Sequence, residues 1–101
     1  MSNDIFFADK DYETLSLVRK WARGRTAQLA EHFGVHPNTL YAQYKGIAFN
    51  EGIWNKTQML MREEGVRPCV RRMVLRYVMR NITLKNRVLM DKLVKDGNEV
   101  E

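Results

Sequence analysis

The chain has 101 residues, of which 45% are hydrophobic, and it carries a formal net charge of +5. This length predicts one domain with a small core, to which dimerisation would add stability. Residues 1–4 lack the basic start and apolar run of a signal peptide, and no apolar stretch reaches membrane-spanning length, so we expect a cytoplasmic protein with no membrane partner.

The positive charge is concentrated in two blocks with acidic flanks. Residues 15–50 carry a net charge of +4 and residues 65–95 a net charge of +8, whereas residues 1–14 and 96–101 carry −3 each. Clustered basic charge suits a polyanion, because neutralised phosphates release their counterions. A solvated basic face remains the alternative.

Few residues suggest catalysis or metal binding. The lone Cys69 has no partner for a disulfide within the chain, and it excludes a cysteine-rich zinc site. His32 and His36 are four residues apart, but a turn is expected between them and no third ligand is apparent. We therefore expect no enzyme, no cofactor, no metal and no small-molecule ligand. A reactive Cys69 beside the arginines that follow it is the alternative.

Hydrophobic periodicity predicts an all-α fold, a compact domain of about five or six short helices. Glycines and prolines fall at the expected helix ends, and Thr26 is expected to cap the second helix. The β-branched residues within 70–82 leave strands, such as those of a wing, as the alternative. The expected helices cover residues 9–23, 26–33, 37–45, 50–64, 68–80 and 83–95.

The segment 26–45 has the pattern of two short helices joined by a turn. Ala30 is small where the two helices would cross, and Gly34 suits a turn that requires a positive φ. Val35 and Leu40 would return to one shared core. The residues between these anchors are short and polar, as in a helix that faces a DNA groove; a helical hairpin that only packs a core is the alternative.

This arrangement resembles the helix-turn-helix of bacterial and phage regulators. The sequence Gly34-Val35 followed by residues 39–41 and 44–45 is similar to the DNA-reading segment of the tetracycline-repressor family, over about a fifth of the chain. The chain is too short for the ligand-binding domain of that family, so the resemblance implies DNA binding without an inducer pocket. Gln43 departs from the motif, which usually has an apolar residue there, and Tyr44 would supply that anchor.

The resemblance also implies individual roles. Thr39 would approach bases or phosphate, and Tyr41 and Lys45 would reach phosphates. Thr26 and Gln28 would meet the DNA backbone at the N-terminus of the first motif helix, where free N–H groups attract anions.

Side-chain chemistry adds further candidates. The amides of Asn38 and Gln43 could pair with adenine, and Arg25 is a natural phosphate partner. The predicted DNA-binding residues are Arg25, Thr26, Gln28, His36, Pro37, Asn38, Thr39, Tyr41, Gln43, Tyr44 and Lys45.

A second basic surface is expected on the helix at residues 68–80. Three of its arginines are spaced four apart and form one stripe, which would contact nucleic acid or remain a solvated face. The sequence of residues 34–37, Gly-Val-His-Pro, recurs at residues 65–68 as Gly-Val-Arg-Pro. This echo leaves open a tandem pair of motifs, the second at residues 57–80. The surface comprises Arg67, Arg71, Arg72, Arg76 and Arg80.

Together these features predict a sequence-specific double-stranded DNA-binding transcriptional regulator associated with the nucleoid. We expect a homodimeric repressor or accessory factor of bacterial, phage or plasmid type, binding two half-sites. The alternatives are an RNA-binding or protein-interaction adaptor that uses the arginine-rich helix, and a recombination or DNA-organising accessory protein. The expected dimer seam lies in residues 83–95 and consists of Leu84, Val88, Leu89 and Leu93.

Overall fold

The computed structural model describes the backbone of residues 9–100 and the side-chain exposure of residues 11–85. Within that range the chain forms five helices and no strand, so the predicted all-α class is confirmed and the alternative of strands within 70–82 is wrong. No described helix is both long and apolar enough to cross a membrane. The helices are α1 (Asp9–Ala22), α2 (Thr26–Phe33), α3 (Pro37–Lys45), α4 (Glu51–Glu63) and α5 (Pro68–Val100).

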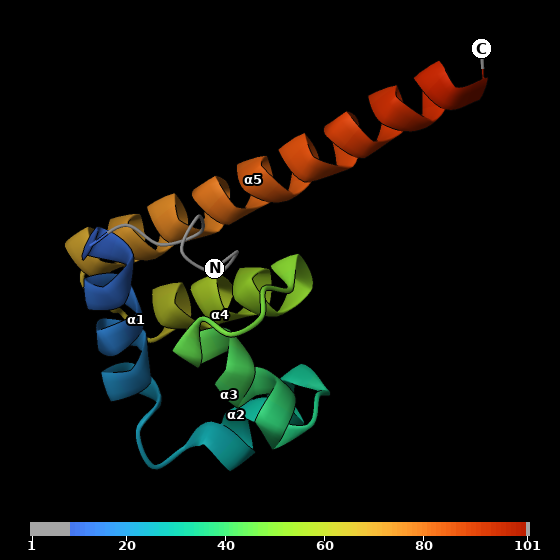
Figure 1. Ribbon diagram of the computed structural model, residues 1–101. Coiled ribbons are helices and arrows are strands. Elements are labelled where there is room, and N and C mark those ends of the chain that lie inside the picture. Colours follow the sequence, from blue (N-terminus) through green and yellow to red (C-terminus); the bar gives the residue numbers. More distant parts are fainter. Residues whose placement is uncertain (1–8, 101) are drawn as a thin grey trace.

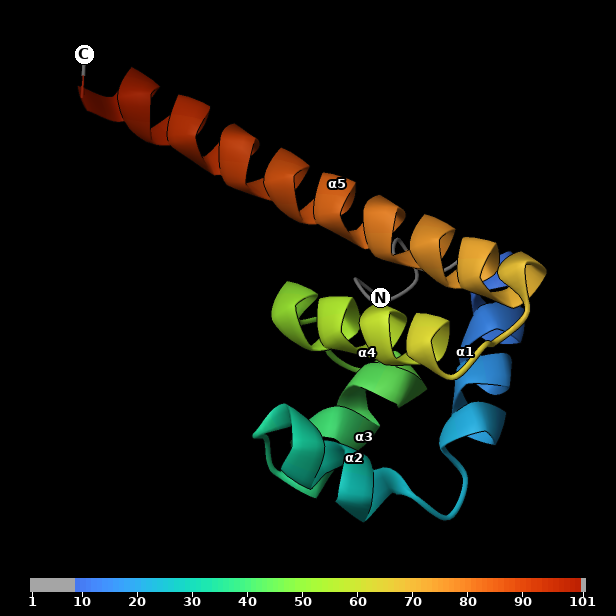
Figure 2. The same ribbon diagram turned by 180° about the vertical axis from the view of Figure 1, so that it is seen from behind.

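The helices are arranged around α4 (Figure 1). The long helix α5 runs along one side, its N-terminal part packs against α1 and α4, and its C-terminal half extends beyond the other helices. The pair α2 and α3 lies at the opposite end of the molecule from α5, as the reverse view also shows (Figure 2). The long axis measures 53 Å against 28 and 25 Å for the other two.

The core is centred on Trp54 of α4, which is fully buried. Its ring lies 5.4 Å from the ring of Tyr44 on α3 and 5.2 Å from the ring of Tyr77 on α5, centroid to centroid. Three helices therefore converge on one aromatic side chain, and aromatic burial of this kind contributes strongly to stability. The remaining buried hydrophobic residues are Leu15, Val18, Ala22, Leu29, Ala30, Phe33, Leu40, Ile53, Met61, Val74 and Val78.

One buried hydrogen bond also joins α3 to α4. The Tyr44 hydroxyl lies 2.8 Å from Oγ1 of Thr57, and Thr57 Oγ1 donates to the carbonyl of Ile53 at 2.9 Å. The Thr57 proton is thus used within α4, so Tyr44 is the donor to Thr57. Burial raises the pKa of Tyr44 to about 12, which keeps this donor protonated at neutral pH.

The turn between α2 and α3 matches the expectation from the sequence. Gly34 has φ = 72° in the left-handed region, as predicted, and the Val35 amide donates to the carbonyl of Ala30 at 2.9 Å. Pro37 begins α3, where its missing N–H costs nothing, and Nδ1 of His36 accepts from the Asn38 amide at 3.0 Å. These contacts fix the angle between the two helices.

Two expectations about helix ends are wrong. Thr26 does not cap α2: the cap position is Arg25, and Thr26 Oγ1 instead donates to the carbonyl of Ala22 at 3.5 Å. The last two expected helices are one continuous helix, α5, because no glycine or proline interrupts it near residue 82. Thr83 Oγ1 donates to the carbonyl of Met79 at 2.9 Å within α5 rather than capping a new helix.

The buried pair Tyr44 and Thr57 gives a stability prediction. Replacing Thr57→Val removes the acceptor and leaves a buried tyrosine hydroxyl without its partner, which costs about 1–3 kcal/mol of unfolding free energy. Urea unfolding followed by circular dichroism measures this loss. The double variant Tyr44→Phe/Thr57→Val removes both polar groups and should be less destabilised than the sum of the two single variants. Simple additivity would show that the two hydroxyl groups are not coupled.

Candidate nucleic-acid interface

The α3 helix has a buried face and an exposed polar face. Leu40 is fully buried, as is Ala30 on α2, so the two helices pack closely where the sequence predicts their crossing. The exposed side of α3 carries Asn38, Thr39 and Lys45, together with Tyr41, whose residue surface is 47% exposed. These four predicted DNA-binding residues therefore share one accessible helix face.

The N-termini of α2 and α3 add partial positive charge to this region. Neither helix has an acidic residue in its first turn. His36, Pro37 and Gln28 are exposed near these ends. Free amides and the helix dipole favour an anion at such a position.

Lys45 and Tyr41 form a local unit on α3. The ammonium nitrogen of Lys45 lies 4.3 Å from the centroid of the Tyr41 ring, a cation–π contact that one helical turn permits. The contact holds the lysine charge near the tyrosine hydroxyl. An exposed cation next to an exposed hydroxyl is a combination that suits a phosphate.

A hollow of about 380 Å³ lies between the end of α1 and α3. Three cationic residues line it, namely Arg19, Lys20 and Arg23, and so do Thr26 and Tyr41. Sequence reasoning missed these three cations as site residues, because a basic last turn is also what the dipole of α1 prefers. Their spacing of one, three and four residues, which brings basic side chains together at one end of a helix, could have indicated a cationic site.

Arg19 also has a structural contact. Its guanidinium donates to the carbonyl of Tyr44 at 2.9 Å, near the C-terminus of α3. This bond satisfies one of the carbonyls that the helix leaves free and ties α1 to α3. Lys20 and Arg23 are exposed beside it, so the hollow has one anchored cation and two accessible ones.

Two predicted DNA-contact residues are buried, and those predictions are wrong. Gln43 is 3% exposed, and its Oε1 accepts from the Asn50 amide at 2.6 Å, which orders the loop before α4. Tyr44 is 1% exposed and belongs to the aromatic core, so only its predicted role as an anchor is confirmed. The polar side chain of Gln43 does not face solvent, because its oxygen accepts a hydrogen bond from a backbone amide outside its own helix.

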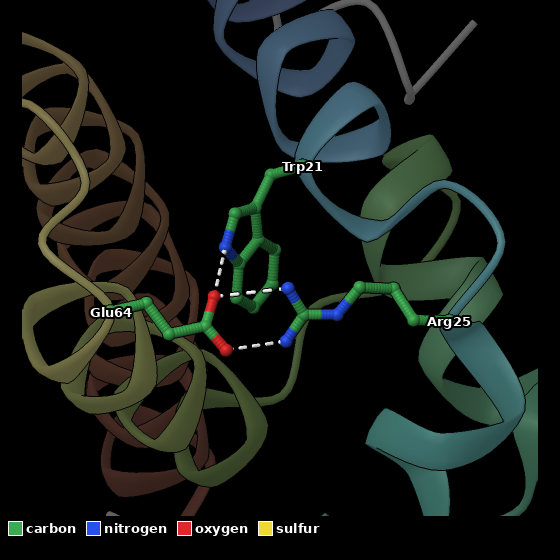
Figure 3. A network of polar contacts seen from close by, with 3 residues as sticks. All are labelled: Trp21, Arg25 and Glu64. Carbon is green, nitrogen blue, oxygen red and sulfur yellow. Dashed lines mark hydrogen bonds and ion pairs between the residues drawn. The ribbon is translucent and has the colours of Figure 1, made fainter.

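Arg25 belongs to a polar network that joins the start of α2 to the end of α4 (Figure 3). Its guanidinium donates to both carboxylate oxygens of Glu64, at 3.0 and 2.5 Å, and Nε1 of Trp21 donates to the same carboxylate at 2.9 Å. The guanidinium also lies 4.9 Å from the centroid of the Trp21 ring. The hydrogen bond from Arg25 is the main reason that the pKa of Glu64 falls below its ordinary value. Arg25 is thus already paired with an acid.

The second basic surface belongs to the N-terminal half of α5 and the turn before it, and α5 runs on the other side of α4 from α2 and α3 (Figure 1). Arg80 pairs with Asp11 of α1, and Arg71 Nε donates to the carbonyl of Val66 at 3.0 Å, so both have partners within the chain. Arg67, Arg72 and Arg76 are exposed. The structure therefore does not bring the two predicted basic surfaces together.

The turn between α4 and α5 repeats the backbone geometry of the turn between α2 and α3. Gly65 has φ = 74°, and the Val66 amide donates to the carbonyl of Met61 at 3.0 Å, as Val35 does to Ala30. The position equivalent to Leu40 is Arg71, which is not part of the core. The sequence echo therefore has a structural counterpart in the turn itself.

Comparisons with protein-family models, with curated proteins and with solved structures each found no match. Among the described residues, no group of three histidine, cysteine or acidic side chains is placed to hold a metal ion.

The Arg25–Glu64 pair predicts a pH-dependent stability. In Glu64→Gln the pair is lost, and because both side chains are about one third exposed, the cost at pH 7 should be no more than about 1 kcal/mol. The depressed pKa of Glu64 means that this contribution is present above its ordinary value of 4.5 and disappears as the pH falls through the folded-state value.

Urea unfolding of the two proteins across this pH range measures the difference. Glu63→Gln, at the adjacent exposed position, is the matched control and should differ little from the wild type at any pH. A Glu64→Gln deficit that stays constant into acid would show that the ion pair is not its source.

Proposed function

We propose that the protein binds double-stranded DNA by inserting the exposed face of α3 into the major groove, and that it acts as a transcriptional regulator. The observation that carries this proposal is the polar, acid-free face of α3, which is held outward by a fully buried opposite face. Any surface helix has a polar outer face, but a face without acidic residues in its first turn also suits the phosphates of DNA.

The dimensions and the position of the polar groups support the proposal. An α-helix with its side chains is about 10–12 Å in diameter and the major groove is about 12 Å wide, so α3 can enter it. In helix-turn-helix proteins the N-terminal residues of the second helix contact base edges. Asn38 and Thr39 occupy those positions here, and the Asn38 amide can pair with adenine in two hydrogen bonds.

Basic groups on two sides of α3 would hold the DNA backbone. Lys20 and Arg23 lie on the rim of the hollow next to Tyr41, and Lys45 stands one turn further along α3. Contacts of this kind fix the register of a protein on the duplex and carry most of the salt-dependent affinity. Base reading would then fall to the N-terminal residues of α3.

An RNA-binding or protein adaptor function would use α5 instead. The pairing of Arg80 with Asp11 removes one member of its arginine stripe, so this alternative has less free charge than the sequence suggests. A DNA-organising or recombination accessory role would use the same α3 surface with little sequence preference. Gel shifts with duplex DNA and with RNA at the same salt concentration distinguish RNA binding from DNA binding. Selection from a random duplex library distinguishes a sequence-specific regulator, which gives a consensus site, from a DNA-organising protein, which gives none.

The Asn38 assignment gives a test of base reading. Asn38→Ala should reduce the preference for a selected DNA site over random DNA by about 1–3 kcal/mol, while the salt dependence of non-specific binding stays unchanged. Fluorescence anisotropy with both duplexes measures this. Gln58→Ala, which replaces an amide on α4, is the control. Equal preference in Asn38→Ala and the wild type would exclude Asn38 as a base reader.

The phosphate contacts give a separate prediction. Lys45→Ala and Arg23→Ala should each weaken binding to all duplexes similarly and reduce the slope of log K against log salt by about 1. Arg67→Ala removes an exposed arginine remote from α3 and serves as the control. If Arg67→Ala reduced the slope and Lys45→Ala did not, the DNA would lie on the surface at α5.

A further inference from the structure

An apolar groove lies between α4 and the start of α5, away from the proposed DNA surface. Its volume is about 380 Å³, and its walls include Met59 and Leu75, which are 65% and 47% exposed. Arg62 and Arg72 border it, and both are exposed. Large exposed apolar side chains that line one groove are typical of a protein-binding site.

The apolar stripe on α5 continues beyond this groove with the spacing of a coiled coil. Leu75 and Met79, four residues apart, are exposed, and Ile82 follows three residues later with part of its surface packed against the core of its own chain. The same register continues through Asn86, Leu89 and Leu93 in the sequence. Alternating steps of three and four residues keep one seam facing a partner helix.

The C-terminal half of α5 cannot reach the groove of its own chain. In both views it extends away from the other helices (Figures 1 and 2). Because α5 is continuous, residue 96 lies about 30 Å along the axis from residue 75. An isolated helical segment of about 15 residues is marginally stable in water, so a partner helix would stabilise this half.

The charges along α5 favour a second copy of the chain as the partner, with its α5 antiparallel. The groove is bordered by arginines, and α5 ends in an acidic stretch that contains Asp96 and Glu99. A parallel pair of α5 helices would set arginines against arginines and acids against acids. An antiparallel pair sets the acidic end of each helix against the arginines of the other.

We propose that two copies of the chain associate through α5 in antiparallel orientation, with the acidic end of each α5 packed along the groove between α4 and α5 of the other. A two-fold axis at residue 86 pairs Asn86 with its counterpart and aligns residue 72 with residue 100 over a helix overlap of about 40 Å. A polar residue within such a seam fixes the register. This seam shares Leu89 and Leu93 with the one predicted from the sequence and leaves out Leu84 and Val88; the side chains of Val88, Leu89 and Leu93 lie outside those that the structure describes. It also does not depend on DNA binding.

Sedimentation equilibrium of the full chain tests the proposal. The wild type should show twice the mass of one chain at micromolar concentration, and the variants Arg62→Glu/Arg72→Glu and Asp96→Lys/Glu99→Lys should each weaken the dimer on the order of tenfold. Combining all four substitutions in one chain restores opposite charges only in the antiparallel dimer, so its affinity should return towards that of the wild type.

Lys20→Glu/Lys45→Glu is the control with a matched charge change. It should leave dimerisation unchanged and abolish DNA binding, which separates failure of this proposal from failure of the proposed function. A monomeric wild type would overturn the proposal. A dimer that neither double variant weakens would also overturn it. So would a dimer whose affinity the fourfold variant does not restore, because a parallel pair has like charges at both ends in the wild type and in the fourfold variant.

Discussion

The structure depends on the burial of Trp54 between Tyr44 and Tyr77. This single side chain brings α3, α4 and α5 together, and the hydrogen bond from Tyr44 to Thr57 fixes the rotation of α3 about its own axis. A helix whose buried face is determined so completely has its opposite face determined as well. The outward direction of Asn38 and Tyr41 is thus a consequence of packing on the other side of α3.

The same packing leaves some basic side chains paired within the protein and others accessible. Arg19, Arg25 and Arg80 each have a partner within the protein, in a carbonyl or a carboxylate from another helix. Lys20 and Arg23 remain accessible near α3. Net charge alone would count all five as equal contributors to a polyanion surface, whereas a charge that is already paired adds less to the attraction of a phosphate.

The two interaction surfaces proposed here are formed by different residues of different helices. The α3 face is polar and basic, and the α4–α5 groove is apolar with a basic border. Their separation means that a duplex and a second copy of the chain would not compete for the same residues. Each proposal can therefore fail without the other.

The helix class, the bounds of α3 and the turn at Gly34 could be predicted from residue order alone, because they follow from local backbone preferences: proline at a helix start, glycine at positive φ and a 3.6-residue period. Which polar residues of α3 are accessible to a ligand became clear from the packing of the helices. Asn38 and Gln43 have the same amide chemistry and both lie on α3, yet Asn38 is exposed, whereas Gln43 is buried and accepts a hydrogen bond from the Asn50 amide of the next loop. The contact between Gln43 and Asn50 crosses the end of a helix and a loop, so the 3.6-residue period of α3 does not predict it.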